Sequence, residues 1–282
     1  MPKLSIITVT LNNCQGLKKT FDSVFAQTFT DYEYLVIDGG STDGSAELIK
    51  KMGNKFVYGI SEKDNGIYHA MNKGIRKATG EYLLFLNSGD YLVNNEVLAD
   101  VAAQSENKDI VYGILVVDEK GQLWHKQYPP KLQFSFFLTD TIPHPSSIIK
   151  RSLFNTVGMF NEKLRTTSDW EFFLNAICKH NATYKYLSVP FTVFNTDGIS
   201  QQKENREWIW QDKQEVLKKN YAAFLDDYKI ADETRLALAD QRQRLHNVGN
   251  SRVWKLRNWL VSSGFVKTLK KITAPEASPS NM

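Results

Sequence analysis

The chain has 282 residues, of which 42% are hydrophobic and 12% aromatic, and this composition is typical of a globular protein with one large domain and an appendage. Its two cysteines, Cys14 and Cys178, are too few for a disulfide framework or a metal cluster, which indicates a reducing compartment. The first residues, MPKLSIITVT, show no export signal, and no uncharged apolar stretch reaches the roughly 18 to 20 residues of a membrane span. We therefore expect a cytoplasmic protein.

The net charge of +4 is unevenly distributed along the chain. Six basic residues and no acidic ones lie in the segment 252–271, so the rest of the chain carries 29 of the 35 basic residues against 31 acidic ones. A nucleic-acid-binding protein more often carries its positive charge across the folded domain. The charge pattern therefore argues against nucleic acid as a partner and places the basic character in the tail.

The first 120 residues alternate between strand-like and helix-like patterns. Residues 4–10 (LSIITVT) and 32–38 (YEYLVID) are short, apolar, and β-branched or aromatic, as buried parallel strands are. Between them, four apolar side chains share one helical face, at Leu17, Phe21, Val24 and Phe25. The pattern then predicts a turn and helix in 39–52, a strand in 55–60, a helix in 66–78 and a strand in 81–87.

This β-α-β-α-β-α-β order predicts an α/β fold with a mostly parallel sheet and right-handed crossovers. Sheets of this kind bind ligands beyond the carboxyl ends of their strands. Four polar segments fall at those ends, at residues 10–13, 38–43, 61–66 and 87–90. We therefore expect a functional site at this edge of the sheet.

The segment 38–45, DGGSTDGS, admits two interpretations. Its Ser, Thr and Asp residues can cap a helix and its glycines suit tight turns, or the segment can bind a ligand. Asp38 differs from the others, because a carboxylate that closes an apolar strand can accept a hydrogen bond from a base or a ribose. Neither G-x-G-x-x-G nor G-x-x-x-x-G-K-[ST] occurs, which disfavours dinucleotide and P-loop sites.

Two further candidate groups lie in the second half. His144 stands between two prolines, where an imidazole can ligate a metal, touch a diphosphate, hold an acceptor or serve the fold alone. Residues 165–177 predict a helix that Thr167 or Ser168 caps, with Asp169 in its first turn. An acid at that position either complements the helix dipole or takes part in chemistry.

The C-terminal part lacks strand signals. Residues 201–250 are rich in helix formers, which predicts a helical extension packed on the domain or on another copy of the chain. Residues 251–273 interleave cations with aromatic and apolar side chains, the composition of a helix in an anionic membrane interface; packing on its own domain is the alternative. We expect residues 274–282 to be disordered.

Four ordered motifs resemble those of the family 2 glycosyltransferases. They are SIITVTLNN (5–13), LVIDGGSTDGS (35–45), SEKDNGIYHAMNKGIRKATGEYLLFLNSGD (61–90) and HPSSIIKRSLFNTVGMFNEKLRTTSDWEFFL (144–174). Together they are far more specific than any single motif. The resemblance implies the GT-A fold, with a catalytic domain at 1–200 whose residues 1–100 bind a nucleotide-sugar and whose residues 101–200 bind the acceptor.

The resemblance also implies roles for individual residues. It makes Asp169 the catalytic base, with Glu171 as second choice, and it makes Asp90 a ligand of Mn²⁺ or Mg²⁺. His144 is a candidate second metal ligand, and His144 and Trp170 are candidate acceptor contacts. The candidate nucleotide-sugar contacts are Thr8, Asn12, Asp38, Asp64, Lys73, Asn87, Ser88 and Gly89.

The sequence departs from the family pattern at several positions. Asn87 and Gly89 stand where many relatives carry acids, which leaves Asp90 as a single carboxylate. Gly39 stands where a second Asp is commoner; Asp64 could supply that nucleoside contact, although an Asx-turn or a helix cap also explains it. His69 stands where many relatives carry Asp, and we expect it on a helix surface.

The resemblance therefore implies an inverting glycosyltransferase, hexosyl or N-acetylhexosaminyl, of bacterial polysaccharide assembly. It would move a sugar from a nucleotide-sugar, a UDP-sugar, to a hydroxyl of a glycan or lipid-linked acceptor at the inner face of the cytoplasmic membrane. A homodimer is a further expectation. The alternatives are a non-catalytic nucleotide-sugar-binding protein, which the depleted acidic cluster would allow, and a Rossmann-like oxidoreductase, which the glycine spacing disfavours.

Overall fold

The computed structural model describes residues 1–196, 206–250 and 252–262. The chain forms two compact units, Met1–Lys219 and Asn220–Met282. The first unit contains the described sheet and every residue predicted for the site. The boundaries predicted at residues 200, 250 and 273 remain predictions.

The first four strands confirm the predicted alternation of strands and helices. They are β1 (Leu4–Thr10), β2 (Tyr32–Asp38), β3 (Tyr58–Ser61) and β4 (Tyr82–Phe85), parallel neighbours in the order β3-β2-β1-β4. Between them lie α1 (Cys14–Phe25), α2 (Ser45–Lys51), the 3-10 turn η1 (Gly53–Lys55) and α3 (Ile67–Lys77). β1 and nearly all of β2 are buried, which is why both are continuous apolar runs.

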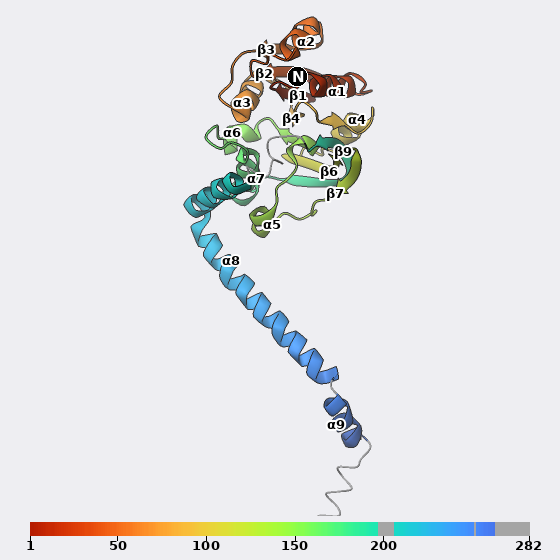
Figure 1. The fold of residues 1–282 in the computed structure, drawn as a ribbon, viewed down its shortest axis with the longest axis vertical. Coiled ribbons are helices and arrows are strands. Elements are labelled where there is room, and N and C mark those ends of the chain that lie inside the picture. The colour runs from red at the N-terminus through yellow and green to blue at the C-terminus, as the bar shows by residue number, and fades with distance from the viewer. Residues whose placement is uncertain (197–205, 251, 263–282) are drawn as a thin grey trace, which may run out of the picture. The chain divides into compact units, whose positions relative to one another are not determined.

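Helices cover both faces of this part of the sheet (Figure 1). On one face, α1 buries Phe21 and Val24 in a cluster with Ile6. On the other face, α3 lies so close that a Cβ on Gly74 would come within 2.5 Å of Cγ2 of Ile7. Because neighbouring strand residues point to opposite faces, this packing fixes both sides of β1 and holds the strand ends in place.

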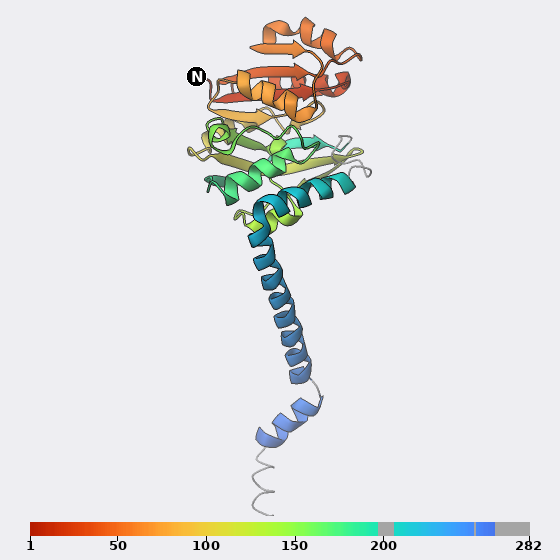
Figure 2. The same cartoon turned by 90° about the vertical axis from the view of Figure 1, so that its left-hand side faces the viewer.

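The second half extends the sheet with mixed strand directions (Figure 2). β8 (Ser147–Lys150) is antiparallel to β4 and to β6 (Ile110–Glu119), and β6 is parallel to β9 (Tyr184–Asn195). β5 (Tyr91–Leu92) pairs with β9, and β7 (Gln122–Lys126) pairs with β6. The other elements are α4 (Val97–Ala103), α5 (Phe134–Thr139), η2 (His144–Ser146), α6 (Leu153–Val157) and α7 (Ser168–Cys178). Because β8 runs antiparallel to β4, its start lies beside the end of β4, which brings η2 to the turn after β4.

The C-terminal region is helical, as predicted. It contains α8 (Arg206–Asn250), which crosses the boundary between the two units, and α9 (Arg252–Ser262). Tyr221 has non-helical angles (φ −138°, ψ 20°), so α8 is kinked there. In the part of the chain that the structure describes, no helix has both the length and the hydropathy that a membrane crossing requires. The disorder expected for 274–282 and the end of the basic tail lie outside the described residues.

Candidate active site

Asp38 lies at the carboxyl end of β2, in register with Thr10 of β1 and Ser61 of β3. Its buried carboxylate accepts hydrogen bonds from the Ser41 backbone N–H at 3.0 Å, from the Ser41 hydroxyl, and from the Ser61 hydroxyl at 2.5 Å. These bonds hold the loop 39–43 against the strand end. Asp38 is thus at the predicted edge and orders the loop, and its contact with a nucleoside remains a prediction.

Asn12 and Thr8 have different surroundings. Asn12 is exposed, with a left-handed φ of 50°, and its backbone and side chain bond to Ser41 (2.7 Å) and Thr42 (2.9 Å). Thr8 is fully buried in β1, where its hydroxyl donates to the Leu86 carbonyl at 2.7 Å. The placement of Thr8 does not favour its predicted nucleotide contact, because the sheet buries this residue two positions before the strand end.

Asp64 is the centre of a charged cluster just before α3. Its Oδ1 lies 2.5 Å from Nζ of Lys73 and 3.0 Å from Nδ1 of His69, and Lys73 also contacts Glu62 at 2.6 Å. Burial alone would lower the pKa of Lys73, but the two carboxylates outweigh burial and raise it. His69, expected on the helix surface, is partly exposed there and is also a partner of Asp64.

The second oxygen of Asp64 is an unsatisfied acceptor. Oδ2 is buried and has no hydrogen-bond partner among the described residues. A Cβ on Gly39 would lie 3.4 Å from this oxygen, so Oδ2 lies beside the loop that Asp38 orders. Since buried acceptors rarely remain unpaired, this atom can accept a hydrogen bond from a ligand there.

The turn 87–90 follows β4 and is tightly held. Gly89 has a φ of 104°, a left-handed value that favours glycine. Its N–H donates to the hydroxyl of Thr20 at 3.0 Å, and Nδ2 of Asn13 donates to the Ser88 carbonyl at 3.0 Å. Asn87 and Ser88 remain partly exposed, so a ligand can approach the turn closely.

Asp169 lies in the first turn of α7 and is 9% exposed. Oδ1 accepts a hydrogen bond from the Tyr68 hydroxyl at 2.8 Å, and Oδ2 lies 2.9 Å from Nδ1 of His144. An ionised carboxylate only accepts, so Nδ1 of His144 donates to it, and Nε2 of the same ring lies 3.3 Å from Nδ2 of Asn87. One chain of hydrogen bonds therefore joins Tyr68, Asp169 and His144 to the turn after β4.

These contacts determine the ionisation of Asp169. Burial by itself would raise its pKa, but the hydrogen bonds from His144 and Tyr68 outweigh burial and lower it. Burial and the charge of Asp169 raise the pKa of Tyr68 well above its usual value, so its hydroxyl stays protonated and donates. Asp169 is thus an ionised carboxylate at neutral pH, which is the form that accepts a proton.

Asp90 is the second buried carboxylate of the site, 4% exposed. It accepts a hydrogen bond from the backbone N–H of Asn195 at 3.1 Å. Burial raises the pKa of Asp90 to about 7, against a smaller lowering effect from the hydrogen bond of Asn195. Near neutral pH the carboxyl is therefore divided between its two forms, and a cation placed beside it favours the ionised one.

The residues near the turn 87–90 offer a divalent cation three kinds of donor atom. They are the carboxylate of Asp90, Nε2 of His144, and Oδ1 of Asn87, which is buried without a hydrogen-bond partner among the described residues. Over residues 1–196, 206–250 and 252–262, no three His, Cys, Asp or Glu side chains gather as a metal site. The donors fit Mg²⁺ or Mn²⁺ held through one carboxylate and completed by phosphate oxygens and water.

Three other predictions for α7 have different outcomes. Trp170 is 1% exposed and its Nε1 donates to a backbone carbonyl of α5 at 2.7 Å, so this placement does not favour its predicted acceptor contact. Glu171 accepts a hydrogen bond from Asn161 at 3.0 Å. Thr167 is the N-cap residue, but neither its side chain nor that of Ser168 caps the helix. Thr167 thus occupies the predicted N-cap position without a side-chain cap hydrogen bond.

Sequence reasoning missed two residues beside the site. Tyr68 is 101 residues from Asp169 in the chain, and Lys213 of α8 places Nζ 5.0 Å from the ring centre of Trp170. Burial lowers the pKa of Lys213, and Asp169 and Asp140 partly offset it. The signal for Tyr68 was its position on the buried face of α3, because a buried tyrosine hydroxyl needs a partner.

Comparison with known proteins identifies the family. The family model for glycosyl transferase family 2 matches residues 5–162, more than half of the chain. This chain belongs to glycosyl transferase family 2. A PGL/p-HBAD biosynthesis glycosyltransferase of Mycobacterium bovis is 32% identical over 220 residues, which are 74% of this chain and 83% of that protein. A Mycobacterium tuberculosis protein of the same name has the same identity and coverage.

Solved structures share the fold of this family 2 glycosyltransferase. S. aureus TarS 1–349 in complex with UDP-GlcNAc has a TM-score of 0.56 at 24% identity, over 68% of this chain and 58% of that chain. The mannosyltransferase PcManGT from Pyrobaculum calidifontis, in complex with GDP-Man and Mn²⁺, has a TM-score of 0.51 at 14% identity, over 98% of this chain and 88% of that chain. At these identities the likeness shows the fold alone. It confirms the predicted GT-A fold, and family membership excludes the oxidoreductase alternative.

Proposed function

We propose that this protein is an inverting glycosyltransferase of cell-surface polysaccharide biosynthesis. It transfers a sugar from a UDP-sugar to a hydroxyl of a glycan or lipid-linked acceptor. One observation carries the proposal: the ionised carboxylate of Asp169 is oriented through both oxygens and is joined by hydrogen bonds to the turn after β4. A general base for sugar transfer must be ordered in this way and must reach the acceptor hydroxyl, which attacks the anomeric carbon from the side opposite the leaving diphosphate.

The chemistry follows from the geometry of Asp169. An acceptor hydroxyl is a poor nucleophile until a base takes its proton. Tyr68 and His144 each use one lone pair of a different carboxylate oxygen, and each oxygen has a second lone pair that can accept the proton. The acceptor oxygen attacks the anomeric carbon while the bond to the diphosphate breaks on the opposite side. A single displacement of this kind inverts the anomeric configuration.

A divalent cation would be held by Asp90 and His144, with Oδ1 of Asn87 as a third donor. When bound, such an ion neutralises the charge of the departing diphosphate. The protein's own contribution is to gather the three donors around the turn 87–90, with no side chain at Gly89 to obstruct the phosphates.

The nucleoside would lie at the ends of β1, β2 and β3. Asp38, Asn12 and Asp64 are the proposed contacts there, and the buried free oxygen of Asp64 supports this assignment. Lys73 would have to exchange one of its carboxylate partners for a phosphate. The TarS complexes with UDP and UDP-GlcNAc support a UDP-sugar as donor, and the sugar can be a hexose or an N-acetylhexosamine.

We also propose a peripheral position on the inner face of the cytoplasmic membrane. In α9, the side chains of Leu256, Trp259 and Val261 are exposed, and every charged residue of the segment 252–271 is basic. Exposed tryptophan and aliphatic side chains among cations suit an anionic lipid interface. A lipid-linked acceptor would lie at the same surface.

The test is turnover with a panel of nucleotide-sugars. Purified protein is incubated with Mn²⁺, one UDP- or GDP-sugar at a time and a short glycan acceptor, and released nucleotide and glycosylated product are measured. Product with a UDP-sugar, formed at least ~100-fold more slowly by the Asp169→Asn variant, supports the proposal. Tight nucleotide-sugar binding without any turnover over the whole panel would favour the non-catalytic alternative.

A further inference from the structure

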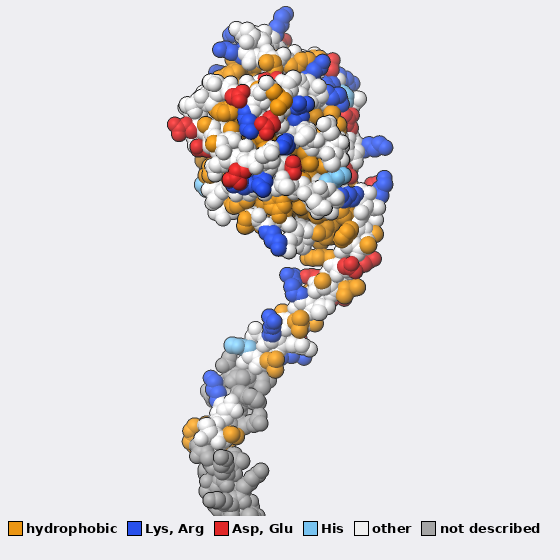
Figure 3. Space-filling view, turned by 180° about the vertical axis from the view of Figure 1, so that it is seen from behind, with side chains coloured by type: hydrophobic (Ala, Val, Ile, Leu, Met, Phe, Trp, Pro, Cys, Tyr) orange, Lys and Arg blue, Asp and Glu red, His pale blue; other side chains and the backbone are white. Residues whose placement is uncertain are grey.

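The C-terminal part of α8, residues 220–250, carries a stripe with the spacing of a coiled coil. Its members follow one another at alternating intervals of four and three residues, which is the a/d repeat of a helix that packs along another helix. Phe224, Leu238 and Leu245 of this stripe are 58%, 50% and 71% exposed, and Figure 3 shows apolar side chains at the surface along this helix. The stripe, here called the seam, consists of Phe224, Tyr228, Ala231, Arg235, Leu238, Arg242 and Leu245.

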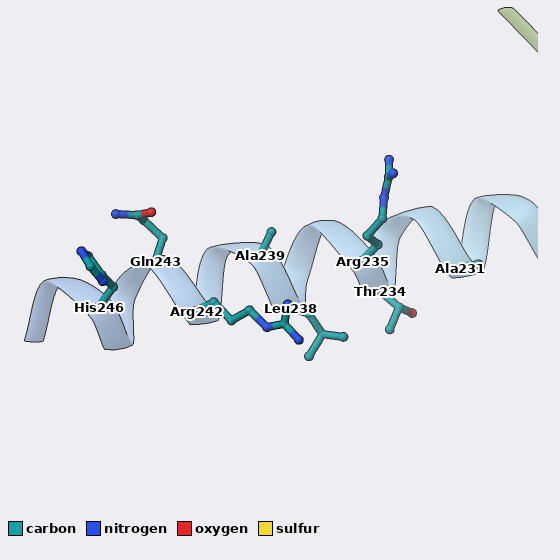
Figure 4. Close-up of a pocket in the computed structure, with 8 residues that line it drawn as sticks. All are labelled: Ala231, Thr234, Arg235, Leu238, Ala239, Arg242, Gln243 and His246. Atoms are coloured by element: carbon teal, nitrogen blue, oxygen red, sulfur yellow. The ribbon is translucent and has the colours of Figure 1, made fainter. Parts of the chain in front are cut away.

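A shallow hollow runs along the seam. Eight side chains line it, and four of them are the seam residues Ala231, Arg235, Leu238 and Arg242. Figure 4 shows that all eight come from α8 itself. A hollow with walls from a single helix does not enclose a small molecule, but it has the form that receives the side chains of another helix. Long helices also depend on tertiary packing for most of their stability.

The charges on this helix are asymmetric. Residues 220–233 contain four acidic residues and one basic residue, which are Asp226, Asp227, Asp232, Glu233 and Lys229. Residues 234–250 contain three arginines and one acidic residue, which are Arg235, Arg242, Arg244 and Asp240. The first half is therefore negative and the second half positive. Two copies of this helix consequently have complementary charges only when they run antiparallel.

The seam residues distinguish between the two directions of pairing. In a parallel pair, Arg235 and Arg242 would each meet the same residue of the second copy, which places like charges in one layer. In an antiparallel pair with Tyr228 opposite Leu238 of the second copy, Ala231 falls opposite Arg235 and Phe224 opposite Arg242. The aliphatic parts of the two arginine side chains can then pack across the interface between the helices, and their guanidinium groups can reach the acidic half of the second copy.

We propose that residues 220–250 pair with the same segment of a second copy of this chain as an antiparallel coiled coil, which makes the protein a homodimer. The apolar seam supplies the attraction. The two arginines within it lower the stability of the pair but specify its direction and register, as polar seam residues do. The charge pattern of the helix thus identifies the partner of the exposed seam as a second copy of the same helix.

The first test measures oligomeric state in the full-length protein. Light scattering with size-exclusion chromatography at ~1 to ~50 µM should show a dimer, and Leu238→Glu should weaken the dimer Kd by about 100-fold or more. Leu236→Glu is the matched control, because Leu236 is 60% exposed but lies about 200° around the helix from Leu238. A monomeric wild type, or equal dissociation of both variants, would overturn the proposal.

The second test measures direction and charge pairing. Tyr228→Cys mixed with Leu238→Cys should give a disulfide-linked dimer under mild oxidation, in excess of the background from Cys14 and Cys178 in the parent protein. Self-linking of Leu238→Cys in place of this cross-link would overturn the antiparallel register.

The double variants Asp227→Arg/Asp232→Arg and Arg235→Glu/Arg242→Glu should each dissociate alone and pair when mixed. Unchanged dimers of either variant alone would show that these charges do not direct the pairing.

Discussion

The hydroxyl of Tyr68 donates to Oδ1 of Asp169 at 2.8 Å and thereby joins α3 to the first turn of α7. α3 carries His69 and Lys73 of the charged cluster near the proposed nucleoside site, and α7 carries the proposed base. His144 occupies the other oxygen of the same carboxylate. Because two donors from different parts of the chain hold it, the carboxylate has one orientation and remains ionised despite its burial.

The Asp169→Asn variant should retain the donor but lose turnover. Asparagine has nearly the same size and can still accept from Tyr68, but it cannot take a proton from the acceptor. We expect kcat to fall by ~10² to 10⁴ with donor affinity nearly unchanged, measured by steady-state kinetics and calorimetry. Glu171→Gln is the control and should remain active. Normal turnover by Asp169→Asn together with an inactive Glu171→Gln would assign the base to Glu171.

The Tyr68→Phe variant removes one of the two donors that orient Asp169. A hydrogen bond to a charged group contributes about 1.5 to 3 kcal/mol, so kcat should fall by roughly 10- to 100-fold while the donor KM changes little. Tyr82→Phe is the matched control, because Tyr82 is also fully buried and its hydroxyl donates to the Lys108 carbonyl at 2.8 Å. If kcat falls to the same extent in both variants, the effect of the Tyr68→Phe substitution is general destabilisation of the protein.

Replacement of Asp90 by alanine should abolish metal-supported transfer. No other carboxylate in the turn 87–90 can take its place. We expect Asp90→Ala to show no transfer at any Mn²⁺ concentration, and wild-type protein treated with EDTA to regain transfer when Mn²⁺ is added back. Undiminished transfer by Asp90→Ala over a full Mn²⁺ titration would remove the metal assignment.

The raised pKa of Asp90 predicts how stability depends on pH in the metal-free protein. An aspartate in an unfolded chain titrates near ~4, whereas burial raises the pKa of Asp90 to about 7 in the folded state. Between these values the folded state holds the extra proton, so the contribution of this group to the free energy of unfolding falls as pH rises from ~4 to ~7.

The Asp90→Asn variant tests this dependence. In EDTA at pH 8 it should be more stable than wild type by roughly 2 to 4 kcal/mol, and the difference should shrink toward zero near pH 4. Urea unfolding at several pH values measures both. A difference that does not change with pH would show that Asp90 titrates normally in the folded protein.

Truncation after Asn250 should separate membrane binding from chemistry. Near an anionic surface each Lys or Arg contributes about 1 kcal/mol, so removal of the basic tail should abolish co-sedimentation with anionic vesicles at low salt. Hydrolysis of the donor should continue, and transfer to a lipid-linked acceptor should slow more than transfer to a short soluble one. Neutral vesicles serve as the control. Equal sedimentation of both proteins would refute the membrane role, and aggregation of the truncated protein would favour packing of the tail on protein.

Much of the fold could be predicted from local patterns. β1 and β2 begin and end where the apolar runs 4–10 and 32–38 do, because strands buried on both faces consist almost entirely of apolar residues. The order of strands and helices then placed Asp38 and the turn 87–90 at one edge, since parallel strands joined by crossovers end at the same side. These properties depend on residues close together in the chain.

Only the tertiary structure decided how the site is assembled. Tyr68, His144 and Asp169 meet because β8 turns back beside β4 and α7 packs near α3, and no pattern of neighbouring residues encodes those distances. The sequence likewise did not distinguish the buried Thr8 and Trp170 from residues open to a ligand. The raised pKa of Asp90 has the same origin, because desolvation depends on all the atoms that surround a group and not on its place in the chain.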